Sequence, residues 1–219
     1  LGLGHAIALG LKNTHNSVLI ILGDSIFDLN YIKFMSTTSN MLGTFEVSDP
    51  SRWGMVEKES NKVVKLIEKP DFSNSSLALA GIYSIKSENN LKSSLEKLFI
   101  NKVKTKNEYQ LTDALQLMVD EGHDFKTMNI DRIYDCGVPS TLIESNRILL
   151  RNTNIIHKTA KVINSTLNNV TIMKDVIVEN SVLENLIILD GAKIKSCKLA
   201  SKIIAKNEVL VKKSNYNFE

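Results

Sequence analysis

Hydrophobic positions in the first 150 residues alternate between short apolar runs and segments with helical spacing. The stretch 17–22 is continuously apolar between turn residues, which is typical of a short strand covered on both faces. Leu91, Leu95 and Leu98 recur at the interval of an amphipathic helix. This alternation predicts an α/β domain over residues 1–150. Helices are expected at 6–11, 29–35, 90–99, 111–121 and 139–150, and strands at 17–22, 41–47, 53–58, 62–68, 79–85 and 125–130.

The pattern changes after Arg151, where aromatic residues disappear until Tyr216 and β-branched residues and asparagine become frequent. A repeat of 16 residues places apolar side chains at matching positions over 151–213, before a short tail at 214–219. Such units bury their apolar face only by stacking on the next unit, so the repeat predicts a solenoid of short strands. The pattern resembles a left-handed parallel β-helix of the hexapeptide type. The side chains expected inside are Leu167, Leu183, Leu199, Ile172, Ile188 and Ile204, and the expected corners are Asn164, Asn180 and Ser196.

Composition narrows the class of protein further. The chain has 219 residues, 43% of them hydrophobic, which is enough for a packed core. Its net charge of +3 argues against a dedicated nucleic-acid binder, which concentrates lysine and arginine on one face. The longest apolar run is far shorter than the ~20 residues that cross a bilayer. The two cysteines form no disulfide framework or CxxC metal motif. We therefore expect a cytoplasmic enzyme with no nucleic-acid or membrane partner.

Charged residues follow several of the expected strands. Asp24 comes after the run that ends at Leu22, where ligands bind in open α/β sheets. Asp135 follows a short strand-like segment, and carboxylates of this kind suit Mg²⁺. Lys69 carries a compact positive charge suited to a phosphate, and Pro70 favours an extended backbone at Lys69. Each acid taken alone is also a good turn or cap residue. Together they predict a site for a metal ion, a sugar and a phosphate.

Seven short motifs occur in one order along the chain: Gly2-Leu3-Gly4-His5-Ala6, Leu22-Gly23-Asp24, Trp53-Gly54-Met55-Val56-Glu57, Glu68-Lys69-Pro70, Ala80-Gly81-Ile82-Tyr83, Glu108-Tyr109-Gln110-Leu111-Thr112-Asp113 and Asp135-Cys136-Gly137. No single motif is specific, but seven motifs in register are strong evidence. Their order and spacing resemble the sugar-1-phosphate nucleotidylyltransferases. The closest resemblance is to the long form of glucose-1-phosphate thymidylyltransferase, and it covers nearly the whole chain.

The resemblance implies a Rossmann-like nucleotidyltransferase domain followed by a short β-helix. It implies that Asp24 and Asp135 bind Mg²⁺ and are catalytic together with Lys69, which contacts the sugar phosphate. Glu68 would accept hydrogen bonds from sugar hydroxyls. The remaining substrate-binding positions implied are Gly2 near the nucleotide base, Gly54 and Gly81 where the backbone approaches the hexose, and Tyr83 in the same pocket. No chemical step is assigned to Glu108 or Asp113.

The implied reaction joins dTTP and glucose 1-phosphate to give dTDP-glucose and pyrophosphate, with Mg²⁺ as cofactor. The family's glycine-rich triphosphate loop would precede Leu1 and is absent from the sequence. Because that loop supplies most triphosphate contacts through backbone N–H groups, we expect an N-terminally incomplete domain with little activity of its own. The solenoid carries no acid cluster or phosphate loop, so we expect it to serve assembly, for example in a homo-oligomer, or stability.

Three alternatives stay open. The motif at Gly2–Ala6 also resembles UTP–glucose-1-phosphate uridylyltransferases, and uracil differs from thymine by one methyl, a distinction worth only ~1–3 kcal/mol in a pocket. Hexapeptide β-helices often belong to acyltransferases that use a histidine base, for which His157 is the candidate in the solenoid. The chain could also be a non-catalytic assembly or regulatory subunit.

Overall fold

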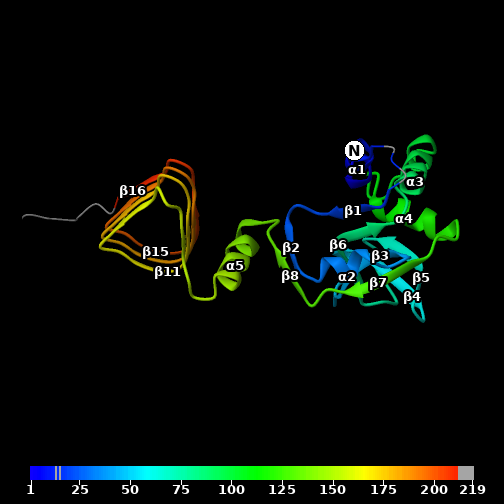
Figure 1. The fold of residues 1–219 in the computed structure, drawn as a ribbon, viewed down its shortest axis with the longest axis horizontal. Coiled ribbons are helices and arrows are strands. Elements are labelled where there is room, and N and C mark those ends of the chain that lie inside the picture. The colour runs from blue at the N-terminus through cyan, green and yellow to red at the C-terminus, as the bar shows by residue number, and fades with distance from the viewer. Residues whose placement is uncertain (13, 15, 212–219) are drawn as a thin grey trace, which may run out of the picture. The chain divides into compact units, whose positions relative to one another are not determined.

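The computed structural model describes residues 1–12, 14 and 16–211, so the tail expected at 214–219 lies outside the described residues. The chain divides into two compact units, Leu1–Ile133 and Tyr134–Glu219, which Figure 1 shows as an α/β unit and a coiled unit. Helix α5 (Pro139–Leu150), which the sequence analysis assigned to the first domain, lies in the second unit.

The first unit is built on a six-stranded sheet with the strand order β5-β4-β6-β3-β7, in which β1 also pairs with β6. Strands β3 and β7 are parallel, whereas β6 is antiparallel to β1, β3 and β4. Strands β4 and β5 form an antiparallel hairpin. The strand bounds are β1 (Val18–Ile21), β3 (Asn40–Glu46), β4 (Gly54–Glu59), β5 (Lys62–Glu68), β6 (Leu77–Ile85) and β7 (Phe125–Asn129).

Strand β6 is buried along its whole length because apolar layers cover both faces of the sheet. Successive side chains of a strand point to opposite faces. Leu79 and Tyr83 accordingly join the larger core, which includes side chains of helices α3 and α4, while Ala80 and Ile82 join a smaller core with Phe34 of α2. The helix bounds in this unit are α1 (Leu3–Gly10), α2 (Tyr31–Met35), α3 (Glu88–Ile100) and α4 (Leu111–Asp120).

The expected helices and strands of this unit are confirmed to within a few residues at their ends. The run at 17–22 is covered on both faces, as expected, because Val18 and Ile20 pack against the larger core and Leu19 against the smaller one. Strand β1 pairs with β6 alone among the described strands, its first three residues are half-buried, and Ile21 is exposed. Two short elements were not predicted because they lack a long apolar pattern: β2 (Ser25–Asp28) and the 3₁₀ helix η1 (Pro50–Arg52). Strand β8 (Arg132–Asp135) corresponds to the short strand-like segment expected before Asp135.

The second unit contains a parallel β-solenoid, as the repeat predicted. Its strands form two four-stranded sheets, β10-β12-β14-β16 and β15-β13-β11-β9. Each paired residue lies opposite the residue 16 positions further along the chain, on the neighbouring strand. Val162, Val178, Ile194 and Leu210 are stacked in this way. The left hand of the β-helix stays a prediction. The bounds are β9 (Ile155–Ile156), β10 (Lys161–Ile163), β11 (Thr166–Ile172), β12 (Ile177–Glu179), β13 (Val182–Ile188), β14 (Lys193–Lys195), β15 (Lys198–Ile204) and β16 (Val209–Val211).

Polar residues turn the solenoid's corners, as expected. Asn164, Asn180 and Ser196 have φ values of 47°, 47° and 55°, in the left-handed region where asparagine is favoured among residues with a side chain. At a second corner, Asn169 Nδ2 donates to Asn185 Oδ1 of the next coil at 3.2 Å. The six apolar side chains predicted to point inward all belong to one core, which confirms the repeat assignment.

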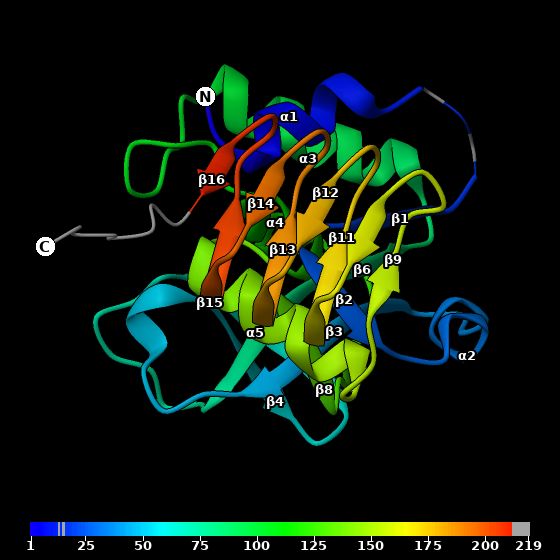
Figure 2. The same ribbon diagram turned by 90° about the vertical axis from the view of Figure 1, so that its left-hand side faces the viewer.

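Helix α5 packs on one side of the solenoid, against β11, β13 and β15. Figure 2 shows the helix beside the stacked strands. A side-chain hydrogen bond of 2.6 Å from Thr171 Oγ1 to Asn146 Oδ1 joins β11 to the helix. The helix and the solenoid therefore form one packed body.

Candidate functional site

Glu68 lies at the end of β5, where its side chain is mostly buried, with 10% of its surface exposed. Its Oε2 atom accepts a hydrogen bond of 2.5 Å from the hydroxyl of Thr112, in the first turn of α4. Gly54 on β4 is the cross-strand partner of Glu68. The sheet and helix α4 thus bring three residues from three separate motifs together.

Lys69 leaves the strand in an unusual conformation. Its φ is +43°, so the extended backbone expected before Pro70 is wrong. The Lys69 amide donates to the carbonyl of Trp53 at 2.9 Å, and this bond fixes the chain as it leaves β5. The Lys69 ammonium lies 3.7 Å from Glu68 Oε1 and its side chain is 44% exposed. A buried carboxylate therefore stands beside a positive charge that remains open to an anion in solution.

Two further ionisable groups lie within electrostatic range of Glu68. Burial raises the pKa of Tyr83 well above its usual value, and the charge of Glu68 raises it further. Burial also raises the pKa of Asp113, with a smaller contribution from Glu68, against the effect of a hydrogen bond from Thr105. Within the described part of the chain, the buried Oδ2 atom of Asp113 has no hydrogen-bond partner. A carboxylate whose pKa is raised by burial and by a neighbouring charge is typical of functional sites.

Asp113→Asn is expected to raise the melting temperature at about pH 8 and to have little effect at about pH 4. The raised pKa of Asp113 means that its contribution to stability is full below the ordinary aspartate pKa of 3.8 and is lost as the pH rises through the folded-state pKa. Asparagine does not ionise and avoids this loss. Thermal melts of both proteins across this pH range measure the difference, with Asp131→Asn as an exposed control. A gain that does not change with pH would contradict the assignment.

The other predicted glycines occupy tightly packed positions. Gly2 has a φ of +103°, and a Cβ there would lie 2.7 Å from the carbonyl oxygen of Tyr109. Gly81 has a φ of +90°, and a Cβ there would lie 2.9 Å from Leu22 Cδ1. Both positions therefore require glycine for the fold itself. Their roles beside the nucleotide base and the hexose stay predictions.

The two predicted metal ligands belong to different compact units. Asp24 lies on the exposed turn after β1, and the amide of Leu22 just before it donates to Gly81 O at 2.9 Å. Asp135 ends β8, and one of its carboxylate oxygens accepts from the amide of Gly137 at 2.8 Å. This bond is the local turn contact that a non-catalytic aspartate would also make.

The donor chemistry at Asp24 and Asp135 fits Mg²⁺. Magnesium prefers oxygen ligands, and proteins commonly supply one or two carboxylates while water and substrate phosphates complete the shell. Asp24 is exposed, and the bond from Gly137 engages one oxygen of Asp135. Among the described residues, no group of three or more histidine, cysteine, aspartate or glutamate side chains is arranged to hold a metal.

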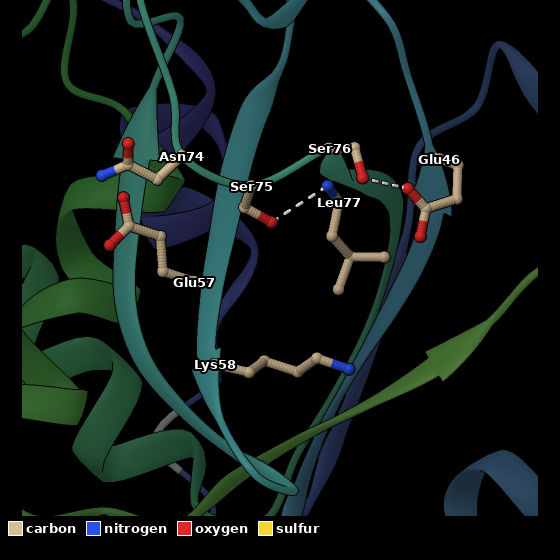
Figure 3. Close-up of a pocket in the computed structure, with 7 residues that line it drawn as sticks. All are labelled: Glu46, Glu57, Lys58, Asn74, Ser75, Ser76 and Leu77. Atoms are coloured by element: carbon tan, nitrogen blue, oxygen red, sulfur yellow. Dashed lines mark hydrogen bonds between the residues drawn. The ribbon is translucent and has the colours of Figure 1, made fainter.

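A hollow of about 470 Å³ lies elsewhere in the first unit. Figure 3 shows the side chains that line it. Its polar wall includes the hydrogen bond from Ser76 to Glu46 and the ammonium of Lys58. None of the predicted site residues lines it. The residues that do are Glu46, Glu57, Lys58, Asn74, Ser75, Ser76 and Leu77.

Sequence reasoning missed the contact between Thr112 and Glu68. Both lie in quoted motifs, but 44 positions separate them and nothing in either motif pairs them. In the solenoid, His157 is exposed on the first coil, and its Nδ1 lies 3.0 Å from Thr159 Oγ1. This is a local contact between neighbours in the chain.

The first unit thus has an α/β sheet with a buried carboxylate beside an exposed lysine at the end of β5, and the second has a parallel β-solenoid. Residues 2–152 match the family model described as nucleotidyl transferase. The match covers more than half of the chain, and the chain belongs to the nucleotidyl transferase family. The family assignment expected from the seven motifs is therefore confirmed, and the closeness to the thymidylyltransferases stays a prediction.

Two relatives support this assignment. The chain is 30% identical to the bifunctional protein GlmU of Methanococcus vannielii, over 83% of this chain and 43% of that protein. It is 32% identical to a bifunctional sugar-1-phosphate nucleotidylyltransferase/acetyltransferase of Sulfurisphaera tokodaii, over 69% of this chain and 37% of that protein. The chain thus spans less than half the length of these relatives.

A solved structure of UDP-glucose pyrophosphorylase complexed with UDP-glucose has the same fold, with a TM-score of 0.57 and 23% identity. The likeness covers 68% of this chain and 62% of that one. Among the described residues of our protein, no helix is long and apolar enough to cross a membrane.

Proposed function

We propose that the protein transfers a nucleotidyl group from a nucleoside triphosphate to a sugar 1-phosphate, with dTTP and glucose 1-phosphate as the substrate pair. The observation that carries the proposal is the pair at the end of β5, in which the buried Glu68 lies beside the exposed Lys69. A carboxylate accepts hydrogen bonds from sugar hydroxyls, and an ammonium attracts the phosphate next to them. The pair lies within the region that matches the nucleotidyl transferase family.

In the proposed reaction an oxygen of the sugar phosphate attacks the α-phosphorus of the triphosphate. A new P–O bond forms there while the bond to the β-phosphate breaks, and pyrophosphate leaves with that electron pair. Such a transfer depends on positioning and charge neutralisation more than on covalent help from the protein. Lys69 would hold the sugar phosphate, and Glu68 would orient the sugar. Asp24 and Asp135 would hold Mg²⁺, which when bound would supply positive charge to the phosphates.

UTP is the second candidate for the nucleotide. The solved structure with the same fold is a UDP-glucose pyrophosphorylase, and its likeness to this chain supports testing UTP beside dTTP. The two bases differ by one methyl group, which a pocket distinguishes by only ~1–3 kcal/mol. The name of the relative from Sulfurisphaera tokodaii also includes acetyltransferase, so an acyl-transfer arm through His157 is tested in parallel.

The test measures pyrophosphate release by the full-length gene product that carries residues 1–219. Each of dTTP, UTP, ATP and GTP is combined with several sugar 1-phosphates, with and without Mg²⁺. We expect turnover with dTTP and glucose 1-phosphate that depends on Mg²⁺. A separate arm supplies acetyl-CoA and amino-sugar phosphates.

The outcomes separate the alternatives. A clear preference for UTP would reject only the choice of dTTP. The absence of turnover with every pair would reject the nucleotidyl transfer itself. Acetyl transfer that is lost in His157→Ala would support the second activity, and pyrophosphate release that is unchanged in the same variant would separate the two.

A further inference from the structure

The hydroxyl of Thr112 makes a contact to Glu68 that the proposed reaction has not yet used. Thr112 is buried, with 4% of its surface exposed, and its Oγ1 donates to Glu68 Oε2 at 2.5 Å. A hydrogen bond to an ionised carboxylate is about twice as strong as one between neutral groups. The contact joins the first turn of α4 to the last residue of β5.

The two oxygens of Glu68 therefore differ in their partners. Oε2 is held by Thr112, whereas Oε1 lies 3.7 Å from the Lys69 ammonium. The terminal torsion of a glutamate has a broad energy minimum, so a free carboxylate rotates readily. The bond from Thr112 removes this freedom and leaves Oε1 as the oxygen on the side of Lys69.

Gly54 makes room for this pair. A Cβ at that position would lie 3.0 Å from Thr112 Oγ1 and 3.2 Å from Glu68 Oε2, both tighter than ordinary contacts. It would also lie 2.8 Å from Leu79 Cδ1. The glycine thus has a role in protein packing, beside the hexose contact expected from the sequence.

Asp113 follows Thr112 on α4, and its charge makes the hydrogen bond from Thr112 to Glu68 more important. Its carboxylate is partly buried and interacts unfavourably with the charge of Glu68. Without the donor at Thr112, this repulsion would act on a carboxylate that is free to turn away. The Thr112 hydroxyl opposes this movement because its hydrogen bond holds the Glu68 carboxylate in one orientation.

We propose that Thr112 is a positioning residue for sugar recognition, which holds Glu68 so that Oε1 is presented to a hydroxyl of the sugar 1-phosphate. The inference rests on the proposed function and adds the residue that determines how well Glu68 distinguishes the sugar. Thr112 itself does not touch the substrate. Its effect should therefore appear in the binding of the sugar phosphate and not in the binding of the nucleotide.

The test uses Thr112→Val, which keeps the shape of the side chain and removes the donor, in the full-length gene product. We expect the KM for the sugar 1-phosphate to rise by about 10-fold to 100-fold, the range for a lost hydrogen bond to a charged group. The KM for the nucleotide should change by less than about twofold on the same argument. Thr112→Ser restores a hydroxyl and should recover most of the affinity.

A matched control is Thr44→Val, because Thr44 is also buried in this unit but its hydroxyl donates to the carbonyl of Met128. Thermal melts of each variant separate a loss of folding from a loss of recognition. Gly54→Ala, which crowds the pair, should reproduce the selective rise in KM.

Two results would overturn the inference while the wild type is active. One is a Thr112→Val variant with normal KM values or with equal rises for both substrates. The other is a Thr112→Ser variant whose KM values equal those of Thr112→Val. An inactive wild type would instead reject the proposed function, so the two failures are distinguishable. Calorimetric binding of glucose 1-phosphate to the same variants provides a readout that does not depend on turnover.

Discussion

Replacing Asp24 or Asp135 with asparagine is expected to lower kcat by about 100-fold to 1,000-fold while leaving the fold intact. Each change removes one negative charge from a proposed magnesium site whose task is charge neutralisation. The loss corresponds to several kcal/mol of transition-state stabilisation, which is the size expected for a metal ligand. Asp24 is exposed, and the amide that bonds to Asp135 can also donate to an asparagine oxygen, so neither change should unfold the protein. Initial rates across a range of Mg²⁺ concentrations provide the measurement.

Asp28→Asn is the matched control for Asp24, since Asp28 is an exposed acid of β2 close by in the sequence. It should keep the wild-type rate and the wild-type dependence on Mg²⁺. If Asp24→Asn and Asp135→Asn also kept both, the two aspartates would be turn residues and the metal assignment would be wrong.

Lys69→Ala is expected to raise the KM for the sugar 1-phosphate by about 10-fold to 100-fold, with a much smaller effect on the KM for the nucleotide. The reason is that Lys69 would pair with the phosphate of only one of the two substrates. Its side chain is 44% exposed, so removing it should cost the fold little. Steady-state kinetics with each substrate varied in turn measure the two effects separately.

Lys65→Ala serves as the control, because Lys65 is an exposed lysine on the same strand whose ammonium lies 4.0 Å from Glu57. It should change neither KM. Equal rises in both KM values for Lys69→Ala would reject its assignment to the sugar phosphate. Lys69→Arg should recover less than full affinity, because a planar guanidinium does not replace a compact ammonium.

The solenoid could be predicted from the sequence because a repeat carries its own register. Leu183 and Ile188 recur 16 residues later as Leu199 and Ile204, and the same interval separates paired residues on neighbouring strands. One interval therefore identifies both the inward side chains and the corners. The helices and strands of the α/β unit could be predicted, but the extent to which each one is buried could not. The apolar run before Leu22 predicts a strand covered on both faces, and its alternate side chains do pack on the two cores. The sequence did not show that this strand has one partner among the described strands or that Ile21 is exposed.

The candidate site was also predicted only in part. Glu68 and Lys69 are neighbours in the sequence, and their position after an apolar strand was sufficient to propose a substrate site. The contact between Glu68 and Thr112 could not be predicted, because it depends on where α4 packs against β5. The left-handed backbone at Lys69 opposes the preference that Pro70 imposes. The Lys69 amide also donates to the carbonyl of Trp53, and the sequence around Lys69 does not predict this tertiary contact.

The strand pairing of the solenoid also restricts how this part of the chain can change in length. Every coil pairs with the next at a spacing of 16 residues. A deletion of one residue would turn the following side chains of that coil to the opposite face and place lysines in the apolar interior. Removing or adding one whole coil would instead leave the pairing of all the others unchanged. We therefore expect insertions and deletions among natural relatives to occur here in complete coils, so that the solenoid lengthens or shortens over evolution in discrete steps.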